Sequence, residues 1–275
     1  MRVRVSPPAP SSTIKRPNLF NPPLKWAGGK RWMLPHVRPV WRDHSARRYV
    51  EPFCGGLAIA LGLQPKHALL NDLNPHLINF YQQVKRGLSI DIDARYDEEL
   101  FYTQRSRFNQ LISNGGANSS EAAQLFYYLN RTCFNGLCRF NQRGEFNVPF
   151  GKYAAVTYAK NFSAYRAGLK AWKFTNLDLE RLQINPRDFI YADPPYDVEF
   201  TTYSAGGFSW NDQVRTAQSL AEHPGPVLLS NQATSRIISL YRKLGFRLKF
   251  LEAPRRISSN GNRDAAREVL ASRNL

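Results

Sequence analysis

The most constraining feature of this chain is a short apolar run that ends at two consecutive prolines. In DFIYADPPY (188–196), a run of apolar residues typical of an inner strand is followed at once by Asp193, Pro194 and Pro195. Proline has no backbone N–H and a fixed φ, so the chain cannot go on pairing as a central strand beyond this point. The segment therefore predicts a buried strand that places Asp193 and Tyr196 in a rigid turn at its carboxyl end.

A second region predicts the alternating strands and helices of a parallel sheet. RRYVEPF (47–53) contains a strand-like run, and after a Gly-Gly pair the apolar stretch LAIALGL (57–63) is typical of a helix. HALLND (67–72) is the next apolar run, and residues 74–87 carry apolar side chains at helical spacing behind Asn74, a residue type that caps helices. This order predicts a βαβ unit, and hence a parallel sheet.

The middle of the chain interrupts this α/β pattern. Residues 88–130 predict amphipathic helices with a break at NGGANSS (114–120), whereas residues 131–153 are polar, aromatic and rich in glycine, as in a hairpin or a shaped loop. Strand-like runs return at PVLLSN (226–231) and at FRLKFLEA (246–253), which alternates like an edge strand. We therefore expect a Rossmann-like α/β fold with a mainly helical inserted lobe that contains a hairpin.

These patterns predict a division of the chain into three parts. Residues 1–22 are basic and rich in proline, which predicts a flexible tail without regular hydrogen bonding. Residues 23–76 and 161–275 are expected to form a split catalytic and cofactor-binding domain, and residues 77–160 an inserted target-recognition domain. A chain of 275 residues has room for one such domain and its insertion.

The charge of the chain points to a polyanionic partner. Lys and Arg number 38 against 21 Asp and Glu, a formal net charge of +17, and residues 1–50 hold 11 basic residues against one acidic. Such an excess favours nucleic acid over an anionic membrane surface as the partner. A basic surface that is merely solvated is the alternative.

Other features disfavour several classes of protein. No apolar stretch approaches ~18 residues, so no membrane span is expected, and no apolar stretch typical of a secretory signal follows Arg2 and Arg4. Cys54, Cys133 and Cys138 have neither zinc-ligand spacing nor an even number for disulfide pairing. We therefore expect reduced thiols and no metal in a cytoplasmic protein.

The glycine pair after the first strand suits a close approach of the backbone to a ligand. In EPFCGGLAIA (51–60) the third glycine of a dinucleotide fingerprint is missing, which disfavours a pyrophosphate but permits an adenosine without phosphates. Asp72 follows Gly55 by 17 residues, at the end of the next strand, where its carboxylate can accept both ribose hydroxyls. A capping Asp in an ordinary strand–turn–helix is the alternative.

The Asp-Pro-Pro-Tyr turn suits chemistry on the exocyclic amino group of a base. That nitrogen is a poor nucleophile because its lone pair is delocalised, and a carboxylate with the ordinary pKa of ~3.9 cannot deprotonate it. Asp193 can instead accept one N–H and the Pro194 carbonyl the other, which directs the lone pair towards an incoming methyl group. Tyr196 offers a face on which an extruded base can stack. A Pro-Pro turn with a capping Asp is the alternative.

A third motif, KWAGGK (25–30), precedes the first strand. Trp26 can cover a flat cofactor, and Lys25 and Lys30 can reach a carboxylate or a phosphate. A basic surface loop with its Trp in the core would contain the same residues.

Together with NGLCRFNQRGEFNVPFG (135–151), these motifs resemble the DNA adenine-N6 methyltransferases of the Dam type, which modify the adenine of GATC. The order of cofactor motif, recognition lobe and Asp-Pro-Pro-Tyr is that of the alpha group, and the resemblance covers roughly residues 23–270. RRISSNG (255–261) and PVLLSN (226–231) add to it. The resemblance implies the Rossmann-like fold of S-adenosylmethionine-dependent methyltransferases, S-adenosylmethionine as cofactor, and double-stranded DNA as substrate.

The resemblance also implies roles for individual residues. The cofactor would be bound by Trp26, Lys30, Phe53, Asp72 and Asp193, and the flipped adenine would be held by Asp193, Pro194 and Tyr196. The residues expected to contact DNA are Lys25 at the outer guanine, Phe134 as an aromatic wedge, Asn135, and the base-reading Leu137, Arg139 and Pro149.

Physical chemistry supports these DNA contacts but leaves alternatives. Arg139 suits guanine O6 and N7, and the apolar Leu137 and Pro149 suit a thymine methyl group. A phosphate contact is the alternative for Arg139, and a core position in the lobe is the alternative for Phe134.

Three stretches depart from the pattern of the family. FCGGL (53–57) stands where the family usually has FxGxG, and Phe134 stands where many members carry Tyr, which keeps the ring and loses its hydroxyl. EFTTYSAGGF (199–208) resembles the mobile loop that follows the turn but differs at Ser204 and at 206–207.

Two other functions compete with a GATC-directed enzyme. An adenine methyltransferase of a restriction–modification system or mobile element, with a different site, needs only altered hairpin contacts, each worth ~1–3 kcal/mol. A catalytically silent DNA-binding scaffold would have no reason to keep Asp72 and Asp193. Asp193 favours DNA adenine, because related amino-cytosine enzymes tend to carry Ser there and glutamine or RNA-adenine enzymes Asn. Every motif lies on one chain, so we expect a monomer.

Overall fold

The fold is built on one mixed sheet of seven strands. The computed structural model describes residues 21–197, 207–253 and 266–275. The strand order is β3-β2-β1-β4-β5-β7-β6, in which the first five strands are parallel and β7 is antiparallel to β5 and β6. The strands are β1 (Tyr49–Glu51), β2 (Ala68–Asn71), β3 (Trp172–Thr175), β4 (Phe189–Ala192), β5 (Val227–Gln232), β6 (Arg247–Ala253) and β7 (Ala266–Arg273).

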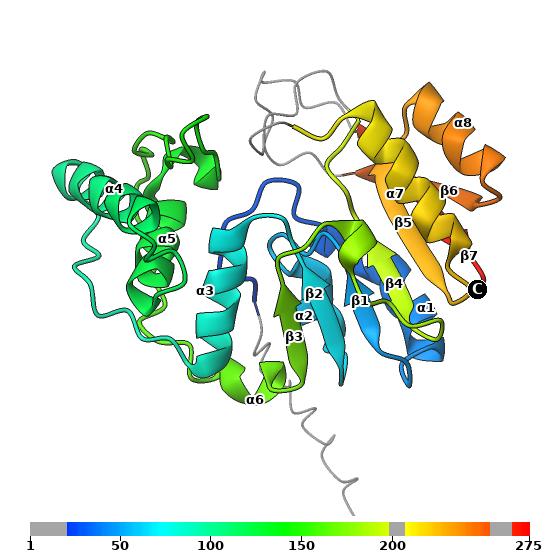
Figure 1. Cartoon of the computed structure of the whole chain (residues 1–275), viewed down its shortest axis with the longest axis horizontal. Helices are drawn as coiled ribbons and strands as arrows, with labels where there is room; N and C mark the ends of the chain where they lie inside the picture. The colour runs from blue at the N-terminus through cyan, green and yellow to red at the C-terminus, as the bar shows by residue number, and fades with distance from the viewer. Residues whose placement is uncertain (1–20, 198–206, 254–265) are drawn as a thin grey trace, which may run out of the picture.

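Helices pack against the sheet, and α4 and α5 extend beyond it on one side (Figure 1). The α-helices are α1 (Leu34–Asp43), α2 (Ala58–Leu63), α3 (Pro75–Arg86), α4 (Glu98–Ser113), α5 (Ser120–Thr132), α6 (Tyr165–Leu169), α7 (Trp210–Glu222) and α8 (Ser235–Lys243). Short 3₁₀ turns lie at η1 (Arg31–Met33), η2 (Phe134–Gly136) and η3 (Leu179–Arg181). Figure 1 shows α4 and α5 beyond α3, on the side of the sheet opposite to α7 and α8.

Strand β4 shows why both faces of the sheet are covered. Phe189 and Tyr191 pack into the core cluster that contains α1, α2 and α3, whereas Ile190 and Ala192 pack into the cluster of α7 and α8. Successive side chains of a strand point to opposite faces, so a strand that is apolar at every position is buried on both. The prediction of a buried strand before the prolines is confirmed.

Helix α3 joins the sheet to the inserted region. Its cap is Asn74, whose side chain accepts the N–H groups of His76 and Leu77 at 3.0 and 3.1 Å, and Pro75 takes the first helical position. This prediction is confirmed. The apolar core runs without a break from the sheet through α3 into α4 and α5. The expected boundary between residues 76 and 77 therefore lies inside a helix, and the division into domains stays a prediction.

Residues 131–153 form a narrow antiparallel hairpin, one of the two forms expected for them. Bridges pair Cys133 with Phe150 and Phe140 with Phe146. At the tip, Asn141 Oδ1 accepts two backbone N–H groups, from residues 143 and 145, at 3.0 and 2.9 Å. An Asn side chain that bonds the following backbone in this way is a common device of tight turns.

The expectation of helix from residue 88 onwards is wrong for its first ten residues. Residues 88–97 are irregular: Ser89 bridges to Asn161, and Gln124 Oε1 accepts the N–H groups of Asp91 and Ile92. Helix α4 begins only after Asp97, whose side chain accepts the Leu100 N–H at 2.8 Å. Aspartates favour caps and turns over helix interiors because their carboxylates compete for nearby backbone groups.

Of the remaining predictions, one is confirmed, and three elements of the structure were not predicted. FRLKFLEA is the edge strand β6, as expected, whereas the helix α1 and the strands β3 and β7 were not anticipated. The expected tail, apart from residues 21 and 22, lies outside the described residues, as do residues 199–206 of the loop after the turn and all of RRISSNG (255–261).

Candidate active site

The expected site residues after the strands lie at one edge of the sheet. β1 is parallel to β2 on one side and to β4 on the other, so their carboxyl ends lie next to each other. Phe53 follows β1, Asp72 follows β2 and Asp193 follows β4. In an open parallel sheet, this edge is where ligands bind.

Asp72 is fixed by the backbone around it. One carboxylate oxygen accepts the Gly55 N–H at 3.0 Å and the other accepts the Asn74 N–H at 3.0 Å. Burial raises the pKa of Asp72, and these two N–H groups oppose that rise. Each oxygen keeps a further lone pair, so the carboxylate can still accept hydroxyl groups from a ligand.

The glycine pair makes room for Trp26. A Cβ atom at Gly55 would lie 2.7 Å from Trp26 Nε1, and one at Gly56 would lie 2.7 Å from Trp26 Cβ. Gly55 also has a φ of +44°, which strains other residues. The sequence predicted that the backbone at these glycines comes close to a ligand. In the structure it also comes close to the Trp26 indole, and this contact holds the KWAGGK segment against the end of β1. Phe53 is half-buried there, edge-to-face with Phe208 at 5.8 Å.

Asp193 lies between a hydroxyl and an ammonium group. Ser230 donates its hydroxyl to Oδ1 at 2.7 Å, and Lys30 Nζ lies 3.6 Å from Oδ2. Burial raises the pKa of Asp193, and Lys30 and Ser230 both act to lower it. The side chain is still 18% exposed, so the carboxylate remains open to a ligand.

Lys30 connects Asp193 to two further groups. Its Nζ lies 3.7 Å from Glu268 Oε1 on β7 and 4.1 Å from the centre of the Tyr196 ring. Lys30 and Glu268 are both buried, and burial raises the pKa of Glu268 while Lys30 lowers it. The ammonium group therefore occupies one face of the Tyr196 ring, and a stacked base would take the other face.

The turn itself is held from α7 and β5. Gln213 donates from Nε2 to the Pro195 carbonyl at 2.7 Å, and Asn231 donates to Gln213 Oε1 at 2.9 Å. Asp197, just beyond the turn, accepts from Thr234 and from the guanidinium of Arg236.

The Pro194 carbonyl is left free by these contacts. Within residues 21–197, 207–253 and 266–275, no donor is bonded to it. Among the described residues, the end of β4 thus combines a carboxylate with an adjacent carbonyl that accepts no hydrogen bond.

The hairpin carries the residues expected to contact DNA. Phe134 is 48% exposed, and its N–H donates to the Pro149 carbonyl at 2.8 Å. Asn135 is exposed with a φ of +52°, and Arg139 is exposed with its Nε bonded to Asn147 at 2.8 Å. Leu137 is partly buried and Pro149 is exposed. The exposure of Phe134 is inconsistent with a core position.

Lys25 links the hairpin to the sheet edge. Its backbone N–H donates to Asn130 Oδ1 at 2.9 Å, and its Nζ donates to the Arg131 carbonyl at 3.0 Å and lies 3.4 Å from the centre of the Tyr153 ring. Burial and the charge of Arg131 lower the pKa of Lys25. The structure therefore brings Trp26, Lys30, Phe53, Asp72, Asp193, Pro194 and Tyr196 to the sheet edge, whereas Phe134, Asn135, Leu137, Arg139 and Pro149 lie on the hairpin.

The residues that support the turn were not predicted from the sequence. Ser230, Gln213, Asn231 and Glu268 are all buried polar side chains. Ser230 and Asn231 directly follow an apolar run, and because polar groups are costly to bury without partners, that position is the signal that could have found them; Gln213 and Glu268 have polar neighbours in the sequence and carry no such signal.

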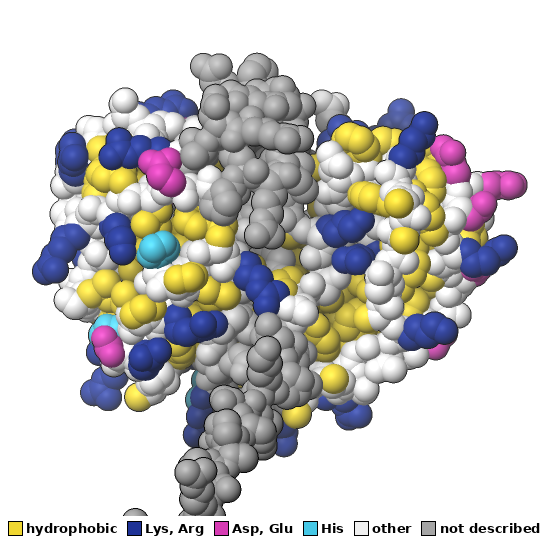
Figure 2. All heavy atoms as spheres, turned by 180° about the vertical axis from the view of Figure 1, so that it is seen from behind, with side chains coloured by type: hydrophobic (Ala, Val, Ile, Leu, Met, Phe, Trp, Pro, Cys, Tyr) yellow, Lys and Arg dark blue, Asp and Glu magenta, His cyan; other side chains and the backbone are white. Residues whose placement is uncertain are grey.

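Other features bear on partners. Figure 2 shows one face of the molecule on which Lys and Arg side chains outnumber Asp and Glu on both sides of the undescribed residues. In the described part of the chain there is no cluster of three or more His, Cys, Asp or Glu that could hold a metal ion. No described helix is long and apolar enough to cross a membrane.

Comparison with known proteins decides the family. Residues 26–257 match the D12 class of N6 adenine-specific DNA methyltransferases. The chain belongs to this class. A DNA adenine methylase of Vibrio cholerae is 35% identical over 90% of this chain and 94% of its own length, and the type II methyltransferase M.MjaIII of Methanocaldococcus jannaschii is 30% identical over 88% and 94%. A DNA N-6-adenine-methyltransferase of Escherichia phage P1 is 33% identical over 90% of this chain, which spans 34% of that protein.

The D12-class assignment settles the reaction, the substrate and the cofactor. The protein is an adenine-specific DNA methyltransferase that uses S-adenosylmethionine as methyl donor. The sheet edge suits that cofactor: Trp26 and Phe53 offer aromatic surface, and Asp72 offers a partly buried carboxylate whose oxygens each keep a further lone pair. The Rossmann-like fold expected from the sequence is the fold observed.

Proposed function

We propose that this methyltransferase flips the adenine of GATC out of duplex DNA and methylates it at N6. The observation that carries the proposal is the turn after β4. Ser230 and Lys30 orient Asp193, Gln213 fixes the turn at the Pro195 carbonyl, and no donor among the described residues is bonded to the Pro194 carbonyl. Two acceptors on neighbouring residues match the two N–H groups of an exocyclic amine.

The chain's own residues prepare the amino group for attack. Asp193 accepts one N–H and the Pro194 carbonyl accepts the other, which localises the lone pair on N6 and stabilises the positive charge that develops there. When bound, S-adenosylmethionine would supply the electrophilic methyl group, its S–C bond breaking as the N–C bond forms and S-adenosylhomocysteine being the leaving group. After the N–C bond has formed, N6 carries one proton too many. Asp193, whose pKa is raised by burial, is the acceptor already bonded to that nitrogen.

Base flipping is supported by two aromatic residues. A base inside a duplex cannot reach Asp193, so enzymes that modify bases extrude them. Lys30 covers one face of Tyr196, and we assign the other face to the flipped adenine. We assign Phe134, which is exposed on the hairpin, to the gap left in the base stack.

Recognition of GATC is assigned to the hairpin and to Lys25. Arg139 has the donors for guanine O6 and N7, and Leu137 and Pro149 the apolar surface for thymine methyl groups. Within the described part of the chain, Lys25 Nζ donates one hydrogen bond, to the Arg131 carbonyl, and its other N–H groups are assigned to the outer guanine. Asn135 lies beside Phe134 and is assigned to the DNA surface.

We assign the cofactor to the part of the sheet edge formed by the ends of β1 and β2, next to the turn. Trp26 and Phe53 would hold its apolar surface, Asp72 the ribose hydroxyls, and Lys30 and Asp193 its charged end. One chain carries every one of these residues, and we propose that it acts as a monomer in the cytoplasm. Its cysteines are unpaired, with Cys54 and Cys133 buried, which fits a reducing compartment.

The test of this function is methyl transfer from labelled S-adenosylmethionine to two duplexes. One carries GATC, and in the other the two central pairs are exchanged to give GTAC, so that both contain the same bases. Transfer to GATC alone is the expected result. Equal transfer to both would keep the reaction and remove the assigned site, and transfer to neither would point to another recognition sequence, such as that of a restriction–modification enzyme.

A further inference from the structure

Arg139 is oriented by a residue on the opposite strand of its hairpin. Asn147 accepts the Arg139 Nε–H at Oδ1, 2.8 Å away, and its backbone carbonyl accepts from Nη2 at 3.3 Å. The Asn147 N–H in turn donates to the Arg139 carbonyl at 3.2 Å. One edge of the guanidinium is thereby fixed, and the edge formed by Nη1 and Nη2 is directed away from Asn147.

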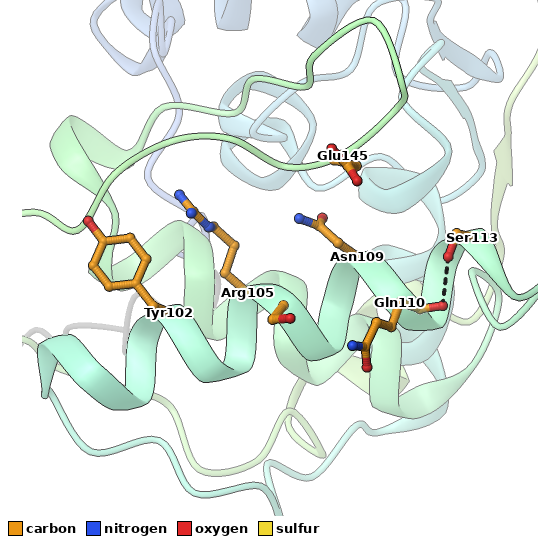
Figure 3. Close-up of a pocket in the computed structure, with 7 residues that line it drawn as sticks. Tyr102, Arg105, Asn109, Gln110, Ser113 and Glu145 are labelled. Atoms are coloured by element: carbon orange, nitrogen blue, oxygen red, sulfur yellow. Dashed lines mark hydrogen bonds between the residues drawn. The ribbon is translucent and has the colours of Figure 1, made fainter.

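The strand that holds Arg139 is itself held by helix α4. Asn109 accepts the Phe146 N–H at Oδ1, 2.8 Å away, and donates from Nδ2 to the Phe146 carbonyl at 3.1 Å. One amide side chain thus bonds both backbone groups of one residue, as a neighbouring strand would, and fixes both the position and the plane of that strand. Figure 3 shows Asn109 pointing from α4 towards the hairpin segment that carries Glu145, while Gln110 points away.

Helix α4 is a rigid support for this contact. Phe108, next to Asn109, is fully buried, and its ring lies edge-to-face with Phe146 at 6.4 Å. Arg105, one turn earlier, donates to the Val148 carbonyl at 3.2 Å. A shallow cavity of about 280 Å³ lies beside these contacts, lined by Arg105, Asn109, Gln110 and Glu145 among others.

We propose that Asn109 is a positioning residue for sequence choice, which acts on DNA through Phe146, Asn147 and Arg139. The proposal rests on the assignment of Arg139 as a base reader. Contacts that discriminate between bases need their groups held to within ~0.5 Å and ~10–20°. Asn109 lies on the far side of the hairpin strand from Arg139, so it sets that geometry without contacting the base.

The experiment compares the ratio of kcat/KM for GATC to kcat/KM for a duplex in which one G·C pair is replaced by A·T. We expect Asn109→Ala to lower this ratio by about tenfold, mainly through KM, because a misplaced Arg139 loses its discriminating contact. Gln110→Ala is the matched control: it lines the same cavity, points away from the hairpin, and should leave the ratio as in the unaltered protein. Thermal unfolding of each variant shows that it is folded.

Double variants separate positioning from a general structural role. If Asn109 acts through Arg139, Asn109→Ala should have no further effect on the ratio once Arg139→Ala is present. Asn147→Ala, which removes the last link on the exposed hairpin, should reproduce the effect of Asn109→Ala without altering α4. An additive effect of Asn109→Ala on Arg139→Ala, or an unchanged ratio for Asn109→Ala alone, would overturn the proposal. An unchanged ratio for Arg139→Ala would overturn the assigned base reading itself.

Discussion

The catalytic turn and the recognition hairpin are fixed by different means. The turn (193–196) follows a buried strand and is bonded from neighbouring elements by Ser230 and Gln213, both of which are buried. The hairpin (131–153) pairs with itself at two bridges and exposes the side chains that are meant to meet DNA. From α4, Asn109 and Arg105 bond the backbone of its returning segment.

We propose that this difference separates the control of methylation rate from the control of DNA sequence choice. Acceptors that stabilise a developing charge work best when burial and several hydrogen bonds fix them in advance. Base-reading side chains must instead reach into a groove, so they stand in solvent and depend on a few contacts at their base. Changes at the turn should therefore lower the rate on every sequence, and changes at the hairpin should alter which sequences are methylated.

The largest effect is expected from removal of the turn's carboxylate. Asp193→Ala deletes one of the two acceptors for the adenine amino group and should lower kcat by ~10³-fold, as loss of a transition-state partner does. DNA binding should stay within about twofold, because Asp193 contributes no positive charge to the DNA surface. Single-turnover methyl transfer and a binding titration at fixed salt measure the two quantities. A rate close to that of the unaltered enzyme would contradict the role given to Asp193.

A smaller loss of rate is expected at Gln213, which links the turn to β5. Gln213→Ala removes the donor to the Pro195 carbonyl and one of the partners of Asn231, and we expect kcat to fall about tenfold on every DNA sequence, since an unmet buried hydrogen bond costs ~1–3 kcal/mol. Gln218→Ala, at an exposed position on the same helix, is the control. A Gln213 variant that changed sequence choice instead of kcat would break the separation of rate from choice.

The two regions also differ in how far their sequences predict them. Around the turn, apolar periodicity predicted β4, and proline chemistry predicted where it ends, because both rules act over a few neighbouring residues. The polar supports of the turn could not be placed in the same way. Gln213 lies 18 residues from Pro195, and Glu268 is more than 200 residues from Lys30. Only the packing of β5, β7 and α7 around β4 brings them together.

For the hairpin, the sequence predicted two possible forms but not how it is anchored. The polar, aromatic and glycine-rich composition of residues 131–153 indicated a hairpin or a shaped loop, and the structure has a hairpin whose turn is held by Asn141. Asn109 lies on a helix that was expected to begin at residue 88 and begins at Glu98. Its contact with Phe146 spans 37 residues. An asparagine on a helix face has no local signature that tells a solvated side chain from one that binds a distant strand.

Phe134, the proposed aromatic wedge, provides a test of the hairpin's role in base flipping. Phe134 is half exposed, so Phe134→Ala should hardly affect stability, yet loss of stacking worth ~1–3 kcal/mol should reduce the population of flipped adenine about tenfold. A fluorescent reporter base at the target position measures flipping directly. Phe134→Tyr keeps the ring and should flip normally. Unchanged fluorescence in Phe134→Ala would show that the exposed ring does not enter the base stack.

The smallest effect concerns the pH dependence of the turn. Asp193 must be ionised to accept the amino N–H, and burial raises its pKa, so the acid limb of kcat should lie above the ordinary ~3.9 of an Asp side chain. Lys30 opposes that rise, while the titratable groups around the pair include Glu268, Tyr196, Glu51, Tyr191 and Tyr241. Lys30→Met removes the positive charge and should move the limb to higher pH, so that activity is lost earlier on acidification.

Lys30→Arg keeps the charge and is the control for this shift. Single-turnover rates at saturating S-adenosylmethionine, measured across the acid range, separate a displaced limb from weaker cofactor binding. A limb that lay at the same pH in Lys30→Met and Lys30→Arg would show that Lys30 does not set the ionisation of Asp193. Because the effect belongs to the buried turn, it should be the same on GATC and on altered sequences, unlike any change made in the hairpin.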